Sequence, residues 1–111
     1  MQDQANTIYD VLSSFLQNAQ KDVRLTSTHI SVYCVLFEQW LEHDCVNPFA
    51  ITRRKIMGLS KISIATYHKV MAELNRYGYL TYLPSYHPAL GSRVYLHFEP
   101  RQWDSNDFSA M

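Results

Sequence analysis

Seven basic side chains gather in one half of this chain. Between positions 52 and 98 they stand against a single acidic residue, Glu73. Guanidinium and ammonium groups in such number neutralise phosphates, so they predict a site for a polyanion. A basic face that only contacts solvent would explain the charge alone about equally well. The basic residues are Arg53, Arg54, Lys55, Lys61, Lys69, Arg76 and Arg93.

The residues of an enzyme or a metal site are not arranged in any usual order. The sequence has no Gly-rich phosphate loop and no Ser/His/Asp order, and its five histidines are scattered. His43, Asp44 and Cys45 are adjacent, but they lack the paired spacing of a zinc site. We interpret them as loop residues, and we expect a binding protein that is not an enzyme and has no metal and no cofactor.

The rest of the composition sets the broad class. A chain of 111 residues that is 47% hydrophobic and low in Gly and Pro has room for one folded domain. Its net charge of zero hides an acidic N-terminal part, with six acidic and two basic residues up to position 51, and an acidic tail. We find no run of apolar residues for a membrane span and no signal peptide. Cys34 and Cys45, as two thiols in a chain with an ordinary core, indicate a reducing cytoplasm.

The clearest element that must position the basic residues is a helix over residues 63–76. Its apolar residues recur at three- and four-residue spacing, so they share one side of the helix. They are Tyr67, Val70, Met71, Leu74 and Tyr77. The opposite side is small, polar and mostly basic, with Ala65, Thr66, His68, Lys69, Ala72, Glu73 and Arg76. We expect the first side to be buried and the second to face a partner.

A short basic helix is predicted just before it. Thr52 is expected to cap this helix, Ile56 and Leu59 to point inward, and Gly58 to end it by taking a left-handed conformation. The following turn is residues 59–62, and Ser60 or Ser63 caps the next helix. Gly78 is expected to close that next helix.

Two longer helices are predicted in the N-terminal half. Residues 8–20, capped by Asn6 or Thr7, place Ile8, Leu12, Phe15, Leu16 and Ala19 on one stripe with Val11 beside it. That stripe packs either on its own domain or on a second copy, and the sequence leaves both open. Residues 29–44, capped by Thr26 or Ser27, form a helix that is apolar nearly all round. Its inner stripe is Ile30, Tyr33, Leu36, Phe37, Trp40 and Leu41, and Cys34 is interpreted as a small core residue.

Strands complete the predicted fold. Residues 49–51 suit a very short strand, and residues 79–83 and 94–98 suit a hairpin, the second half of which alternates strictly. The fold class is therefore mainly α with a small antiparallel β-hairpin, an α+β fold. We divide the chain into an N-terminal helix and connector (1–25), a central domain (26–98) and a C-terminal tail (99–111).

The order of these elements resembles the winged helix-turn-helix domains of bacterial DNA-binding proteins. The resemblance rests on GLSKISIATYHKVMAELNRYGYLTY, residues 58–82, in which a Gly-Leu-Ser turn leads to a helix ending in Leu, three residues, Gly and a hydrophobic pair. LTSTHISVYCVLF, residues 25–37, resembles the first helix of such domains in replication-initiation and regulatory proteins. The turn GLSKIS is a few residues longer than the family's commonest form. The implied fold is a winged helix-turn-helix with an extra N-terminal helix.

The resemblance implies a division of labour among the candidate site residues. Residues 63–76 are the recognition helix, on which Ser63, Ala65, Thr66, His68 and Lys69 lie nearest to bases. Arg53, Arg54, Lys55, Lys61 and Arg76 have the reach and charge for backbone phosphates. The loop between the hairpin strands is the wing, whose His87, Ser92 and Arg93 follow the neighbouring backbone or minor groove.

The expected function is sequence-specific binding of double-stranded DNA, by a small bacterial transcriptional regulator in the cytoplasm at the nucleoid. The alternatives are a replication or mobile-element accessory protein and a winged helix that contacts another protein. We expect no membrane and no small-molecule ligand. The apolar N-terminal stripes predict a homodimer, and charged residues at Leu12 and Phe15 are expected to yield a folded monomer.

Overall fold

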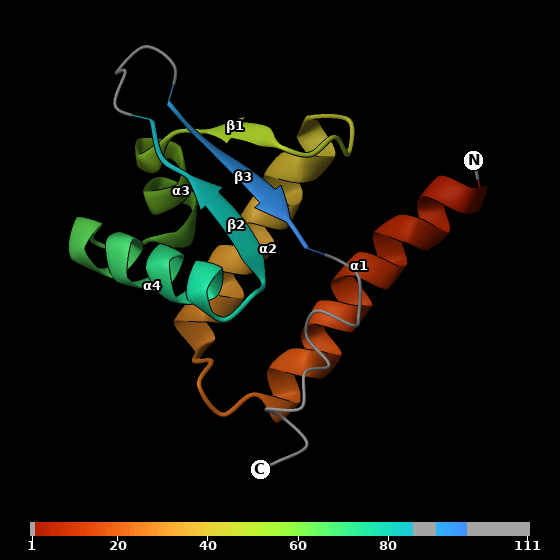
Figure 1. Cartoon of the computed structure of the whole chain (residues 1–111), viewed down its shortest axis with the longest axis horizontal. Coiled ribbons are helices and arrows are strands. Elements are labelled where there is room, and N and C mark those ends of the chain that lie inside the picture. The colour runs from red at the N-terminus through yellow and green to blue at the C-terminus, as the bar shows by residue number, and fades with distance from the viewer. Residues whose placement is uncertain (1, 86–90, 98–111) are drawn as a thin grey trace.

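The computed structural model describes residues 2–85 and 91–97, and for residues 2–7 it describes the backbone alone. These residues form four α-helices and three β-strands (Figure 1), which confirms the α+β prediction. The helices are α1 (Gln2–Lys21), α2 (Ser27–Glu42), α3 (Arg53–Ser60) and α4 (Ile64–Arg76). The strands are β1 (Phe49–Ile51), β2 (Leu80–Leu83) and β3 (Ser92–Leu96).

The strands form one antiparallel sheet in the order β1-β3-β2. The hairpin is therefore joined by the short strand, and Val94 of β3 lies between Phe49 of β1 and Tyr82 of β2. Val94 and Leu96 are buried and Tyr95 is exposed, so the predicted alternation is confirmed within the described part of that strand. The observed strand runs from Ser92 to Leu96, and Phe98 lies outside the described residues.

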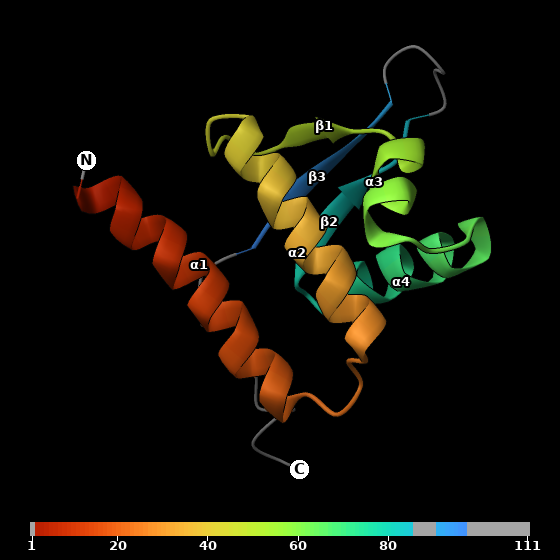
Figure 2. The same ribbon diagram turned by 180° about the vertical axis from the view of Figure 1, so that it is seen from behind.

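The helices lie beside and behind the sheet. Seen from behind (Figure 2), α2 lies between α1 and the pair α3 and α4, with the sheet beyond it. α1 is at one end of the molecule, and α3 and α4 are at the opposite end (Figure 1). This separation gives the molecule two distinct surfaces, one at each end.

Phe15 joins α1 to the rest of the core. Its ring stacks on Tyr33 of α2 with 3.6 Å between centroids, and meets the edge of Tyr79 at 5.5 Å. Val11 and Ala19 are buried with it, so this part of the predicted stripe packs on its own domain. Leu16 is 37% exposed and does not belong to that packed side. The helix begins at Gln2, so the prediction of a cap at position 6 or 7 is wrong.

α2 buries Tyr33, Leu36 and Trp40 as predicted. Cys34 is exposed, however, and Leu41 is 36% exposed, so placing these two in the core was wrong. The reason is that α3, α4, α1 and β1 cover most of α2 but leave one row of its side chains open. An almost wholly apolar helix therefore has an uncovered side.

A charged cluster around the buried Asp22 carboxylate fastens the end of α1 to the residue just before β2. We call Asp22, Arg24 and Tyr79 the junction. Arg24 donates to both Asp22 carboxylate oxygens at 2.8 Å, and the Tyr79 hydroxyl donates to Oδ2 at 2.6 Å. Burial alone raises the pKa of the Asp22 carboxyl, but the hydrogen bonds from Arg24 and Tyr79 outweigh it and hold that pKa below its usual value. The Arg24 guanidinium also covers the Tyr77 ring, 4.2 Å from its centroid.

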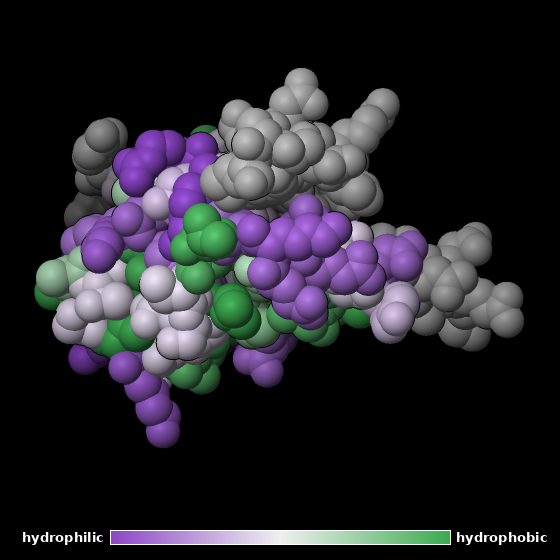
Figure 3. Space-filling model, turned by 90° about the horizontal axis from the view of Figure 1, so that it is seen from below, coloured by the Kyte–Doolittle hydropathy of each residue, from purple (hydrophilic) through white to green (hydrophobic). Residues whose placement is uncertain are grey.

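The outer surface is mixed. Apolar side chains reach it in separate patches among hydrophilic ones, as the view from below shows (Figure 3). Within the described residues, no helix combines the length and apolar character needed to cross a membrane.

Candidate functional site

The basic helix α3 begins as predicted and ends later. Thr52 accepts the backbone N–H of Lys55 at 3.2 Å, and Ile56 is buried. The helix continues through Gly58 to Ser60, and it is Lys61 that takes the left-handed conformation, with φ at 58°. The prediction that Gly58 ends the helix is therefore wrong.

Two consequences follow from this later end. The Ile62 N–H donates to the Met57 carbonyl at 3.2 Å, which closes the last turn in the way expected after a left-handed residue. The side of α3 that packs on the core carries Ile56 and Met57. Leu59 does not belong to that side. It is 47% exposed, so the prediction that it points inward is wrong. The turn to α4 is residues 61–63, shorter than the predicted GLSKIS turn.

The helix α4 has the two sides that its spacing predicts. Tyr67, Val70, Met71 and Leu74 are all buried, and Tyr77 is partly buried against the same core. On the outer side, Ala65, His68, Lys69, Ala72 and Arg76 are exposed and Thr66 is half-buried. The two alanines leave this side low between the longer polar residues. Such a surface presents donors without bulk, which suits close contact with another molecule.

Ser63 acts first as the cap of α4, as predicted. Its Oγ accepts the Thr66 backbone N–H at 3.2 Å and its hydroxyl donates to Thr66 Oγ1 at 3.1 Å. Thr66 keeps its own hydroxyl hydrogen available for another acceptor.

Most of the predicted basic residues lie on α3, on the turn and on the outer side of α4. Arg53, Arg54, Lys55, Lys61, Lys69 and Arg76 are all exposed. Lys55 lies 3.7 Å from Glu42, and Arg76 lies 4.0 Å from Glu73 and near the Tyr77 ring. Exposed pairs at such distances hold their partners weakly, so these cations stay accessible.

A polar pocket of about 430 Å³ lies where α3, α4 and the ends of β2 and β3 meet. Four predicted residues line it: Arg53, Arg54, His68 and Ser92. Sequence reasoning missed the others, which are Thr52, Tyr82, Pro84, Ser85 and Gly91. Among the described lining residues there is no carboxylate, so the pocket is a basic hollow beside the outer side of α4.

Tyr82 and Ser92, which line this polar pocket, lie with their hydroxyl groups close together. The Tyr82 hydroxyl lies 3.4 Å from that of Tyr67 and 3.3 Å from that of Ser92. Burial, followed by the hydrogen bond with Tyr82, raises the pKa of Tyr67, so its hydroxyl stays neutral and can donate. The alternation of β2 was the signal that could have placed Tyr82. A residue two positions after the buried Leu80 faces the same side of the sheet as Leu80.

Gly91 determines how closely the pocket closes at the sheet. Its φ is +67°, and a Cβ added there would lie 2.8 Å from the Ile51 carbonyl oxygen. A side chain at this position would therefore push the start of β3 away from the end of β1 and open the pocket.

The single acidic residue of this half, Glu73, is bound by His29 through one carboxylate oxygen, and its other oxygen lies 4.0 Å from Arg76. Glu73 Oε1 accepts a hydrogen bond of 2.8 Å from His29 Nε2, and His29 Nδ1 accepts the Thr26 N–H at 3.0 Å. His29 is buried, and this chain of hydrogen bonds joins the start of α2 to the middle of α4. It takes up the carboxylate of Glu73 and fixes the position of α4.

Two predicted site residues are not brought together with the rest. Arg93 projects with Tyr95 from the sheet face opposite to the buried Val94, away from α4. His87 lies outside the described residues, so its role stays a prediction.

The remaining candidates for chemistry do not form a cluster. Within residues 2–85 and 91–97, no group of three or more His, Cys, Asp or Glu side chains is placed to hold a metal ion. The Nδ1 of His43 hydrogen-bonds its own helix, at the Gln39 carbonyl. Comparison of the chain with protein-family models, with curated proteins and with solved structures finds no match.

Proposed function

We propose that this protein is a winged helix-turn-helix protein that binds double-stranded DNA in a sequence-specific way. α4 is the recognition helix in the major groove, α3 crosses the backbone, and the loop between β2 and β3 is the wing. The observation that carries this proposal is the outer side of α4. This side has small alanines between polar residues, and cations from α3 and the turn flank it. Its one carboxylate, that of Glu73, accepts a hydrogen bond from His29.

Each part of the surface has a role in this proposal. Thr66, His68 and Lys69 lie in the first half of α4 and reach base edges, as the N-terminal half of a major-groove helix does. Arg53 and Arg54 hold a backbone phosphate at the polar pocket, whose hydroxyls complete its hydrogen bonds. Phosphate contacts supply most of the affinity and base contacts supply the sequence preference.

The biological setting follows from this activity. We propose a bacterial transcriptional regulator in the cytoplasm at the nucleoid, with a replication or mobile-element accessory role as the second candidate. The resemblance of residues 25–37 to the first helix of replication initiators favours that second role.

A salt titration tests the binding itself. If four to six phosphates are neutralised, the logarithm of the affinity for duplex DNA falls with the logarithm of salt at a slope of about −4 to −5. Anisotropy of a labelled duplex at several salt concentrations measures it. Lys21→Ala is the matched control, because it removes an exposed cation that lies on α1 and not on α3, α4 or the turn between them.

Absence of binding at low salt, or an affinity that ignores salt, would contradict the proposal and favour contact with another protein. Selection of bound sequences from a random duplex pool then measures specificity. Recovery of one consensus supports base recognition by α4, whereas a pool without a consensus would restrict the function to backbone binding.

A further inference from the structure

Two large apolar side chains lie exposed among the cations of the basic surface. Leu59, in the last turn of α3, is 47% exposed, and Ile64, the first residue of α4, is 48% exposed. Between them in the chain are the exposed Lys61 and Ser63. Ile62, in the same turn, packs against the core. The chain therefore buries one isoleucine here and leaves the next one in solvent.

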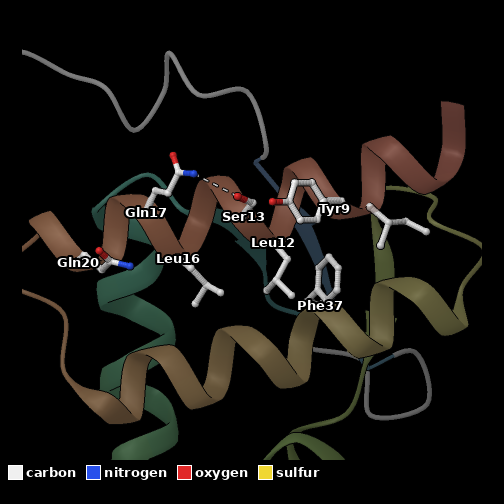
Figure 4. A pocket seen from close by; sticks show the side chains of 8 residues that line it. Tyr9, Leu12, Ser13, Leu16, Gln17, Gln20 and Phe37 are labelled. Atoms are coloured by element: carbon white, nitrogen blue, oxygen red, sulfur yellow. Dashed lines mark hydrogen bonds between the residues drawn. The ribbon is translucent and has the colours of Figure 1, made fainter. Parts of the chain in front are cut away.

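The exposed apolar side chains of α1 have a different setting. Tyr9 and Leu16 line a hollow of about 570 Å³ between α1 and α2, together with Leu12 and Phe37 (Figure 4). They lie beside other apolar side chains, as residues at the edge of a core do. The homodimer expected from this stripe stays a prediction. Phe15 is fully buried, so a charge at that position would unfold the monomer and could not test it.

The first turn of α4 offers methyl groups more than free side-chain donors. The Ser63 Oγ accepts the Thr66 N–H at 3.2 Å, and the Ser63 hydroxyl donates to Thr66 Oγ1 at 3.1 Å. Ile64 and Ala65, which lie between these two residues, have side chains of carbon alone, and both are exposed. The first lysine of the helix is Lys69, in its second turn. A molecule that meets the start of α4 therefore contacts aliphatic carbon there.

The branched side chain of Ile64 is suited to a contact of fixed geometry. In a helix, the two groups on an isoleucine Cβ leave one strongly preferred χ1 angle. Holding this side chain against a ligand therefore costs less entropy than holding a lysine or an arginine. The flexible cations around it are better suited to phosphates, which they can reach in many side-chain conformations.

The major groove of duplex DNA contains a group that matches an aliphatic side chain. The largest apolar group at its base edges is the C5-methyl group of thymine. Most of the other groups there are hydrogen-bond donors and acceptors. An aliphatic side chain that covers one of them displaces water without replacing its hydrogen bond, which costs free energy. Contact with a methyl group instead buries apolar surface on both sides, so Ile64 favours thymine.

We propose that Ile64 reads the C5-methyl group of a thymine in the major groove and so sets part of the sequence preference of this protein. This inference rests on the proposed function, because it requires α4 to enter the groove. His68 and Lys69 then supply hydrogen bonds in the next turn of the helix, and Ile64 supplies the apolar contact. Counting charges could not find this residue, because its side chain is aliphatic.

The test removes one methyl group at a time from the DNA. Each thymine of the duplex selected from the random pool is replaced in turn by deoxyuridine, which keeps the base pair and every hydrogen-bonding group. Anisotropy at one fixed salt concentration measures the affinity. One position, or its symmetric pair in a palindromic site, is expected to weaken wild-type binding by about fourfold, the effect of one buried CH₂ group. In Ile64→Ala the same replacement is expected to change the affinity little, because the side chain that contacts the methyl group is gone.

Val46→Ala is the matched control. Val46 is also a β-branched aliphatic residue and is 58% exposed, but it lies between α2 and β1. This variant is expected to respond to deoxyuridine as the wild type does. Ile64→Val keeps the branch and loses one CH₂ group, so its response is expected to lie between those of the wild type and Ile64→Ala. Urea denaturation is expected to show wild-type stability for both variants of Ile64, since the side chain is exposed.

The outcomes separate failure of this inference from failure of the proposed function. A protein that binds no duplex DNA, or a pool without a consensus, overturns sequence-specific binding and the role of Ile64 with it. A consensus without thymine, or one whose thymines all tolerate deoxyuridine, overturns the role of Ile64 and leaves DNA binding in place. A loss at one thymine that persists at full size in Ile64→Ala does the same, because another residue then reads the methyl group.

Discussion

Arg24 and Arg54 carry the same guanidinium group in opposite surroundings. Arg24 donates to a buried carboxylate at 2.8 Å and covers an aromatic ring, so it belongs to the junction that holds α1. Arg54 is exposed at the polar pocket, and no acidic residue of the described chain pairs with it. The comparison teaches that a charge contributes to stability where its partner is inside the chain, and stays accessible to an outside partner where the described residues offer none.

The largest expected effect is on the stability of the junction. Asp22→Asn keeps the shape but removes the charge that Arg24 and Tyr79 share, so we expect the free energy of unfolding to fall by about 2 to 3 kcal/mol. Urea denaturation measures it. Asp10→Asn, an exposed change on α1, is the control and should alter stability little. DNA affinity of the folded Asp22→Asn protein should match the wild type, and a loss of binding would erase the contrast between the two regions.

The dependence of stability on pH tests the role of the Asp22 charge in the junction. Because the folded-state pKa of Asp22 is below its ordinary value of 3.8, ionisation of this carboxyl favours the folded protein. Its contribution is complete above the ordinary value and is lost as the pH falls through the lower folded-state value. The stability gap between wild type and Asp22→Asn should therefore narrow below pH 3.8. A gap of constant size across that range would mean that the charge of Asp22 does not stabilise the junction.

Next in size is the effect of Lys69 on DNA. Lys69→Ala removes a donor from the outer side of α4, so it should cost about 1 to 3 kcal/mol on the selected duplex and much less on random DNA. Anisotropy with the two duplexes measures both. Stability should not change, because the side chain is exposed. Equal losses on both duplexes would remove α4 from the role of reading helix.

A smaller and uniform effect is expected at Arg54. Arg54→Ala should weaken binding to both duplexes alike and reduce the salt slope by about one unit, since it removes one phosphate contact. The same titrations measure it, and unfolding in urea should follow the wild type. A variant that loses stability instead would place Arg54 with Arg24 on the structural side of the comparison.

The smallest expected effect concerns the backbone of α3. A Cβ at Gly58 would meet nothing within 4 Å, and the residue lies inside the helix. Gly58→Ala should therefore raise the free energy of unfolding by about 0.5 to 1 kcal/mol without changing DNA affinity. If the variant is destabilised, the helix ends at Gly58 after all.

The parts of the fold that depend on neighbours in sequence were predictable. Thr52 and Ser63 cap their helices, and the buried side of α4 follows from its spacing, because both signals lie within a few residues. The end of α3 was not predictable in this way, since Gly58 is a local stop signal but the residue that takes the left-handed conformation is Lys61, three positions later.

Contacts between residues far apart in sequence could not be predicted. Tyr79 and Asp22 are 57 residues apart, and His29 and Glu73 are 44 apart. One sequence holds no signal that joins such positions, so the junction and the polar pocket were not predicted. The cationic residues were predicted, because basic residues can be counted in the sequence. Their proposed division between bases and phosphates stays a prediction.

The asparagines at the sheet edges have a consequence for behaviour at high concentration. Asn75 Oδ1 accepts the Tyr82 N–H at 2.8 Å, on the edge of β2 away from β3. Asn47 hydrogen-bonds both the N–H and the carbonyl of Leu96, just before the three-residue strand β1. An open row of backbone groups is a template for aggregation, and here each edge is short or occupied by an amide. The sheet is therefore a poor seed for fibrils, and Asn75→Ala should make the protein more prone to form them.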